Sequence, residues 1–256
     1  MLKLGASSLA IALSLFWSST VAAQETDSAA QDADSGDIIV TAERRSQRLS
    51  DVPAAISAVD GDDLQQRNLR EVRDLEAISP NLAIRSSYGN AGNPVITIRG
   101  VGLADFNENN SSSAGVYVDE VYQVSPAQLG FGLFDIDRVE LLKGPQGTLY
   151  GRNTIGGAVN FITAKPSDEF ELKQKFTYGS FDQWQSRTTL DTGDLGDTGV
   201  RAKLSYIHRE QDGYVNNPLT SGDRDPGAFS LDAFRAAVSW RPTDGLRADY
   251  TFDFNQ

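Results

Sequence analysis

The sequence predicts an α+β domain followed by the antiparallel strands of an incomplete transmembrane β-barrel. Three observations support this fold class. The chain begins with the pattern of an export signal, residues 51–166 mix helix and strand patterns, and residues 167–256 alternate strictly between apolar and polar side chains. About five strands fit into this last region, whereas even a small membrane barrel needs about eight. We therefore expect the barrel to be incomplete.

Residues 1–23 have the features of a cleavable signal peptide. Lys3 supplies the positive charge, Leu9 to Trp17 form an apolar stretch, and Val21 to Ala23 offer small residues for cleavage. The apolar stretch is shorter than the roughly 20 residues that a membrane-spanning helix needs. The sequence therefore predicts an exported protein that crosses a membrane, if it crosses one, with strands.

The composition argues against several classes of function. The formal net charge of −12 disfavours a nucleic-acid partner, because phosphate binding needs clustered Lys and Arg. The chain has no cysteine, so it can form neither disulfides nor thiolate metal sites. His208 is the single histidine, which leaves no basis for a Ser-His-acid triad or a histidine metal site. We expect no enzyme activity, no catalytic residues, no bound metal ion and no cofactor.

Residues 24–50 are predicted to be a disordered spacer that carries one short apolar segment. Residues 24–36 are small, polar and acidic, with no basic residue, and cannot build a core. The segment that follows is rich in β-branched side chains, which favour an extended backbone. Its six residues are Asp37, Ile38, Ile39, Val40, Thr41 and Ala42.

Residues 51–166 are predicted to form the α+β domain. Short helices are expected at Asp62–Asn68 and Glu71–Ile78, where Ser79 and Pro80 end the second pattern. Polar or glycine-rich loops are expected at 86–93, 102–114 and 125–132. The predicted strands are Ala54–Val59, Val95–Arg99, Val116–Asp119, Val139–Leu142 and Ala158–Thr163.

Residues 167–256 alternate as barrel strands do. A soluble sheet would also alternate, but here one face carries long charged side chains and aromatic residues gather near the strand ends. The segments 191–198 and 242–245 are predicted to be compact turns, and 209–231 a long polar loop. The predicted strands lie within Phe170–Tyr178, Trp184–Leu190, Val200–Tyr206, Phe234–Trp240 and Leu246–Phe254.

Residues Phe134–Gly151 read FDIDRVELLKGPQGTLYG and closely resemble the plug signature of TonB-dependent receptors. The runs Ile98-Arg99-Gly100 and Gly156–Asn160 resemble further parts of that plug. The segment Asp37–Ala42 is similar to the TonB box, in the expected place between signal peptide and plug. The resemblance covers essentially the whole chain after Ala23.

The resemblance implies active transport of a ligand across the bacterial outer membrane. The ligand is commonly a ferric siderophore. TonB would supply the work, and residues 37–42 would bind it by adding themselves as a strand to an exposed sheet edge of TonB. The strands would face outer-membrane lipid. Residues Arg99, Arg138 and Glu140 would hold the plug to the barrel wall. Loop residues implied to face the ligand are Tyr88, Asn90, Phe106 and Asn107.

The chain departs from this family in the number of strands. The family barrel has 22 strands, and about five are expected here, so the sheet would have open edges that cannot face lipid. We expect this polypeptide alone not to transport, whether it is a fragment of a receptor or the product of a truncated gene. Two alternatives are a periplasmic module that binds TonB or ligand, and a passive porin or adhesin.

Overall fold

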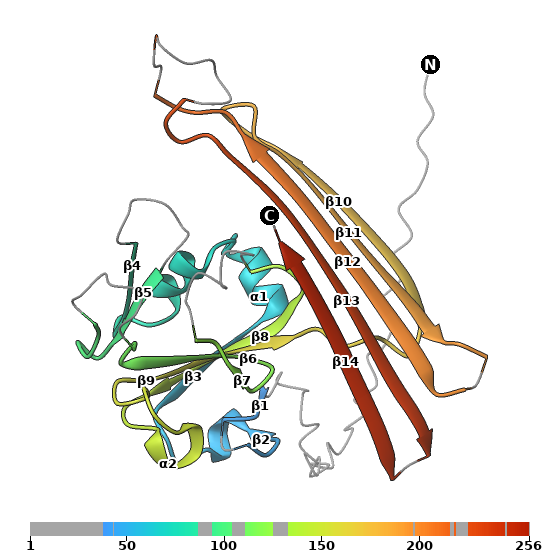
Figure 1. Ribbon diagram of the computed structural model, residues 1–256, viewed down its shortest axis with the longest axis horizontal. Coiled ribbons are helices and arrows are strands. Elements are labelled where there is room, and N and C mark those ends of the chain that lie inside the picture. Colours follow the sequence, from blue (N-terminus) through green and yellow to red (C-terminus); the bar gives the residue numbers. More distant parts are fainter. Residues whose placement is uncertain are drawn as a thin grey trace, which may run out of the picture. The chain divides into compact units, whose positions relative to one another are not determined.

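The computed structural model describes residues 38–42, 44–86, 94–103, 111–124, 133–196, 198–215, 218, 225–243 and 245–255. Within these residues the chain forms two five-stranded sheets and two smaller sheets of two strands each (Figure 1). The predicted signal peptide, the acidic spacer and Asp37 lie outside the described residues. So do the predicted ligand-facing residues Tyr88, Asn90, Phe106 and Asn107.

The first large sheet is mixed and has the strand order β3-β8-β9-β6-β7. Its central strand β9 is buried along its whole length and runs parallel to β6 and antiparallel to β8. At the start of β9, Gly157 has φ +145°, and a Cβ there would lie 2.2 Å from the carbonyl oxygen of Leu142. Glycine is therefore required at this position. The strands are β3 (Ile56–Asp60), β6 (Ala114–Val118), β7 (Val121–Tyr122), β8 (Ile136–Lys143) and β9 (Gly157–Thr163).

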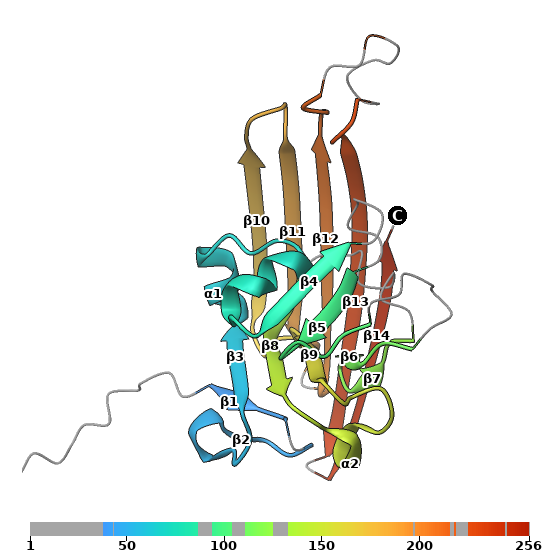
Figure 2. The ribbon, with the colours of Figure 1, turned by 90° about the vertical axis from the view of Figure 1, so that its left-hand side faces the viewer.

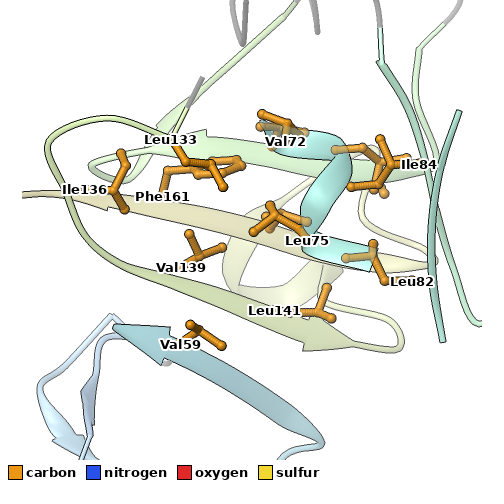
Figure 3. Close-up of a cluster of buried hydrophobic side chains, with 14 of the residues drawn as sticks. Val59, Val72, Leu75, Leu82, Ile84, Leu133, Ile136, Val139, Leu141 and Phe161 are labelled. Atoms are coloured by element: carbon orange, nitrogen blue, oxygen red, sulfur yellow. The ribbon is translucent and has the colours of Figure 1, made fainter. Parts of the chain in front are cut away.

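One face of this sheet is covered by α1 (Gly61–Gln66), the 3-10 helix η2 (Val72–Ile78) and the antiparallel pair β4 (Leu82–Ser86) and β5 (Pro94–Ile98). Asp60 caps α1, because its side chain accepts a hydrogen bond from the backbone of Asp63 at 2.7 Å. Apolar side chains from the two layers meet in the main hydrophobic core (Figure 3). Its labelled members include Val72, Leu75, Leu82, Ile84, Val139, Leu141 and Phe161.

The opposite face of the sheet is covered by the N-terminal described segment. This segment contains β1 (Ile39–Val40), β2 (Gln47–Arg48) and the 3-10 helix η1 (Leu49–Asp51), and the short helix α2 (Gly147–Tyr150) lies on the same side. Because side chains alternate along a strand, Val139, Leu141, Val159 and Phe161 face the first core, whereas Leu142 and Ala158 face the second. The second core consists of Val40, Ala42, Val52, Tyr117, Leu142, Tyr150 and Ala158.

The second large sheet is an antiparallel meander in chain order, from β10 to β14. One of its faces carries the buried polar side chains, and the other carries exposed large apolar ones. Figure 2 shows the five long strands side by side. The strands are β10 (Phe170–Tyr178), β11 (Trp184–Asp194), β12 (Val200–Gln211), β13 (Phe229–Thr243) and β14 (Leu246–Asn255).

The architecture confirms the predicted fold class of a mixed α+β domain followed by about five antiparallel strands. The helix predicted over residues 71–78 forms as a 3-10 helix, and the strand β4 was not predicted. The loop predicted over 209–231 is shorter than expected, because Arg209 and Glu210 pair with Leu231 and Ser230 in the ladder. The turn predicted from residue 191 starts later, since β11 continues to Asp194. None of the helices in the described residues is long and apolar enough to span a membrane.

Candidate functional site

The candidate site is the segment of residues 38–42. It lies on the face of the first large sheet that is opposite to α1 and η2. Its strand β1 pairs antiparallel with β2, and Leu49 donates a backbone hydrogen bond to the Ile38 carbonyl at 2.9 Å. The side chains of Val40 and Ala42 are completely buried, whereas Ile39 is 47% exposed. The β-branched residues Ile39 and Val40 therefore form a strand, and the side chain of Ile39 points away from the core.

Glu140 on β8 fixes the middle of this segment. Its Oε1 atom accepts hydrogen bonds from the backbone N–H of Thr41 at 2.8 Å and from the Thr41 hydroxyl at 3.2 Å. The same oxygen accepts from Nε of Arg138 at 2.8 Å. The guanidinium also donates to the Thr41 hydroxyl at 3.3 Å. A buried carboxylate is thus balanced by an arginine and at the same time binds the segment, as charge-assisted hydrogen bonds allow.

Tyr150 fixes the end of the segment. Its hydroxyl donates to the carbonyl oxygen of Ala42 at 2.9 Å, and the Tyr117 hydroxyl donates to the Tyr150 carbonyl at 2.5 Å. Burial raises the pKa of Tyr150 to about 12, and the negative charge of Glu140 acts in the same direction. The phenol therefore stays protonated and able to donate to Ala42 at neutral pH.

Arg99 lies in a tight turn. The backbone groups of Ile98 and Val101 bond to each other, and both Arg99 and Gly100 have positive φ angles, 54° and 78°. The exposed guanidinium of Arg99 reaches Gly144, where a Cβ would lie 3.1 Å from its Nη1. The structure thus brings two separate plug motifs, Ile98-Arg99-Gly100 and Lys143-Gly144-Pro145, into contact.

Charged side chains join the plug to the second sheet. Lys203 on β12 pairs with Asp135 at 2.9 Å, and both side chains are at least nine-tenths buried. Arg209, also on β12, pairs with Glu71 at 2.6 Å. Arg235 on β13 donates to the carbonyl oxygen of Asp135 at 2.9 Å. The polar face of the sheet therefore holds the plug by charge-assisted contacts.

The structure places the predicted plug–barrel residues differently from these contacts. The hydrogen-bond partners of Arg138 and Glu140 among the described residues are each other, Asp137 and Thr41. Their contact with a barrel wall, like that of Arg99, stays a prediction. The residues that do join the two sheets were missed. The alternating basic residues of β12 and β13 were a usable signal, but the partners of Arg235 and Arg209 lie 100 and 138 positions away in the sequence.

A cavity of about 920 Å³ adjoins the candidate segment. It is lined by Ile39 and Thr41, by the turn between β6 and β7 and by the polar face of β13 and β14. Its walls include more acidic than basic side chains. The exposed side of the segment therefore borders open space next to the plug.

Three comparisons with known proteins agree on a family. The model of the TonB-dependent receptor plug domain matches residues 48–158. The pesticin receptor of Yersinia pestis is 31% identical over 191 residues, covering 74% of this chain and 28% of that receptor. The vitamin B12 transporter BtuB of Vibrio vulnificus is 29% identical over 203 residues, covering 76% of this chain and 31% of the transporter.

A solved structure shows a similar arrangement. The crystal structure of the ferric yersiniabactin uptake receptor FyuA from Yersinia pestis aligns with a TM-score of 0.67 and 29% sequence identity. The alignment covers 75% of this chain and 29% of that receptor. The chain thus spans less than a third of the length of these relatives.

Proposed function

Because this chain belongs to the family of TonB-dependent receptors, which transport ligands and are not enzymes, we propose that, as part of a full-length receptor, it serves active uptake across the bacterial outer membrane. The first sheet and its covering layers form the plug domain, and β10–β14 match the first strands of the receptor barrel. Residues 1–23 would act as the cleaved signal peptide that exports the chain to this membrane.

The observation that carries this proposal is the extended segment on the plug. The outer membrane holds no ATP, so the work has to come from a periplasmic partner. Residues 37–42 would be the TonB-binding segment, which adds itself as a strand to an exposed sheet edge of TonB. In support, Ile39 and Val40 already form a strand, Ile39 is exposed, and a cavity lies beside the segment. TonB would pull on a segment whose anchors, Glu140 and Tyr150, belong to the plug motif itself.

The ligand that we propose is a ferric siderophore. The support is the similarity to a ferric yersiniabactin uptake receptor, which is 29% identical to this chain in sequence. The second relative above is a vitamin B12 transporter, so the ligand class needs a direct test. Candidate contacts are the predicted loop residues Tyr88, Asn90, Phe106 and Asn107, together with loops of the barrel.

The first test of the proposed function is the substitution Ile39→Pro in the complete chain as its cells make it. Proline removes the backbone N–H of residue 39 and so prevents regular strand pairing there. We expect TonB-dependent uptake to be abolished, while the amount of protein inserted in the outer membrane stays unchanged. The measurement is uptake of radiolabelled iron supplied as a panel of ferric siderophores, with cobalamin uptake measured in parallel.

The matched control is Ile39→Val, which keeps the backbone donor and the β-branched side chain and should take up ligand normally. A strain without TonB provides the zero level. Undiminished uptake in the Ile39→Pro variant would show that residues 37–42 are not the coupling segment. Cobalamin uptake without iron uptake would overturn the ligand class and leave the coupling proposal standing.

A further inference from the structure

The floor beneath the candidate segment contains two polar side chains. Glu140 on β8 and Asn160 on β9 lie directly opposite each other in the antiparallel ladder. Both belong to the sheet face that Leu142 and Ala158 share with the buried residues of segment 38–42. Both side chains are completely buried. A position in the middle of a sheet that is buried on both faces usually holds an apolar residue, so two polar ones there are unusual.

Several polar atoms of this floor are without a hydrogen-bond partner among the described residues. They are Oε2 of Glu140 and both side-chain amide atoms of Asn160. A buried polar atom without a partner loses its hydration and gains nothing in exchange, at a cost of about 1–3 kcal/mol. The other oxygen of Glu140 is fully used, because Thr41 and Arg138 donate to it.

We propose that Glu140 and Asn160 form a polar floor that sets how firmly the TonB-binding segment is held on the plug. Oε1 of Glu140 holds the segment through Thr41, while the unpartnered atoms of Glu140 and Asn160 oppose docking. When residues 38–42 leave the plug, water reaches these atoms and restores their hydration. Docking is therefore strong enough to order the segment. It is also weak enough for TonB to take the segment off the plug by pairing with it as a strand.

The proposal makes Asn160 a positioning residue that acts on the segment without touching the partner. It rests on the proposed function in one respect only, namely that residues 37–42 are the segment that TonB binds. The effect on docking itself can be measured without TonB. Replacing Asn160 by Leu keeps the number and branching of the side-chain heavy atoms and removes both unpartnered atoms, so docking should become tighter.

The test uses the absence of native cysteine in this chain. A single Val40→Cys substitution places a thiol at a completely buried position of the segment, where cysteine behaves as a small apolar residue. A charged maleimide reagent labels this thiol only after the segment leaves the plug. We expect Asn160→Leu to slow labelling about fivefold or more, and Glu140→Gln, which weakens the bond to Thr41, to speed it about tenfold or more.

Two reference thiols separate release of the segment from general loosening. Gln66→Cys, exposed on α1 at the opposite face of the sheet, should label at one rate in every variant. Val72→Cys, in the core on the opposite sheet face, should stay protected. Asn160→Val, which suits a strand, is a second apolar variant in case Asn160→Leu disturbs the plug. Unchanged or faster labelling of Val40→Cys in both apolar variants, or loss of protection at Val72→Cys, would overturn the polar floor.

Binding of the purified periplasmic domain of TonB distinguishes a failure of the polar-floor proposal from a failure of the proposed function. If the labelling rates change as expected and TonB binds no form of the chain, the polar floor stands and the coupling function fails. If TonB binds the native chain and both apolar variants equally well and labelling does not change, the coupling function stands and the polar floor fails.

Discussion

At the scale of single residues, Tyr150 connects the plug motif to the candidate segment. Its hydroxyl bonds to the carbonyl oxygen of Ala42, and its ring meets the ring of Tyr117 edge-on at 4.9 Å. The guanidinium of Arg44 lies 5.7 Å from the centre of the same ring. The Tyr150 side chain thus contacts both the end of the segment and the sheet beneath it. Its removal should therefore weaken the docking of the segment on the plug.

The raised pKa of Tyr150 predicts how docking responds to alkaline pH. The phenol has an ordinary pKa of 10.0 when the chain is unfolded and a pKa of about 12 when it is folded. Because the folded value is the higher one, its contribution to stability is complete below about pH 10 and is lost as the pH rises toward about 12. We expect labelling of the Val40→Cys thiol, corrected for the reagent's own pH dependence, to accelerate in this window.

The Tyr150→Phe variant is the matched control for this pH effect. It should release the segment more readily at every pH, by about 1 kcal/mol, because the Ala42 carbonyl loses its buried donor. It should also lack the additional acceleration above pH 10. An equally steep pH dependence in the Phe variant would assign the effect to another group.

The sequence allowed part of this residue-level picture to be predicted. Arg138 and Glu140 stood out through their motif, and Ile39, Val40 and Thr41 through their β-branched run. The contact between Thr41 and Glu140 could not be predicted, because the two residues are separated by 99 positions. Strand alternation indicates which face of a sheet a side chain lies on, but it does not indicate which residue it contacts. A role for Asn160 could not be predicted from its own position in the sequence. That role depends on Glu140, which lies opposite it in the ladder, and on the segment that covers this face of the sheet.

At the scale of elements, the contact between the plug and β12 is the clearest interaction between the two large sheets. Asp135 is the residue before β8 and has a positive φ of 54°, which turns the chain into the strand. Its side chain is 5% exposed and that of Lys203 is 10% exposed. A buried charge pair is costly to break, because the remaining charge has neither water nor partner.

The substitution Lys203→Met should therefore destabilise docking of the plug against the strands by about 3–5 kcal/mol. The double substitution Asp135→Asn with Lys203→Met should recover much of this loss, because no unpaired charge remains. The measurement is the thermal unfolding of the complete receptor in detergent, followed by tryptophan fluorescence. The control is Lys173→Met, which removes an exposed pair with Glu171 and should cost about 1 kcal/mol or less. Equal effects of the two single Lys variants would contradict the assignment.

Strands with a strict period of two were the most completely predicted; in the first domain α1, β3, β5, β6, β8 and β9 were also expected, whereas β4 and β7 were not. The strands β10–β14 followed from alternation, and pairing in chain order followed from short turns. The extensions of β12 and β13 beyond the predicted limits were missed, because their ends carry polar residues such as Arg209, Glu210 and Asp232. These side chains find partners across the ladder and on the plug, which no local pattern reveals.

At the scale of the whole molecule, the second sheet has the reverse polarity of a soluble sheet. Its polar face is buried along β11–β13, and its even-numbered positions expose large apolar side chains, which soluble proteins avoid in such numbers. A lipid environment accounts for both properties, as in barrels with an apolar outer band and a polar interior. The exposed residues include Phe170, Leu172, Phe176, Leu204, Val238, Trp240, Tyr250 and Phe252.

The environment of this apolar face decides between a membrane receptor and a periplasmic binding module. Val238 on β13 belongs to the apolar face, whereas Thr251 on β14, which pairs with the adjacent Ala237, lies on the polar face. An arginine at a lipid-facing position near the membrane centre costs about 2–4 kcal/mol, so Val238→Arg should reduce the fraction of receptor inserted in the outer membrane. Thr251→Arg, which points to the polar side, should insert like the native chain. The measurement is the amount of each variant that resists extraction from outer-membrane vesicles by urea. Equal insertion of both variants would mean that lipid does not cover this face, and it would favour a periplasmic module whose apolar side is covered by protein.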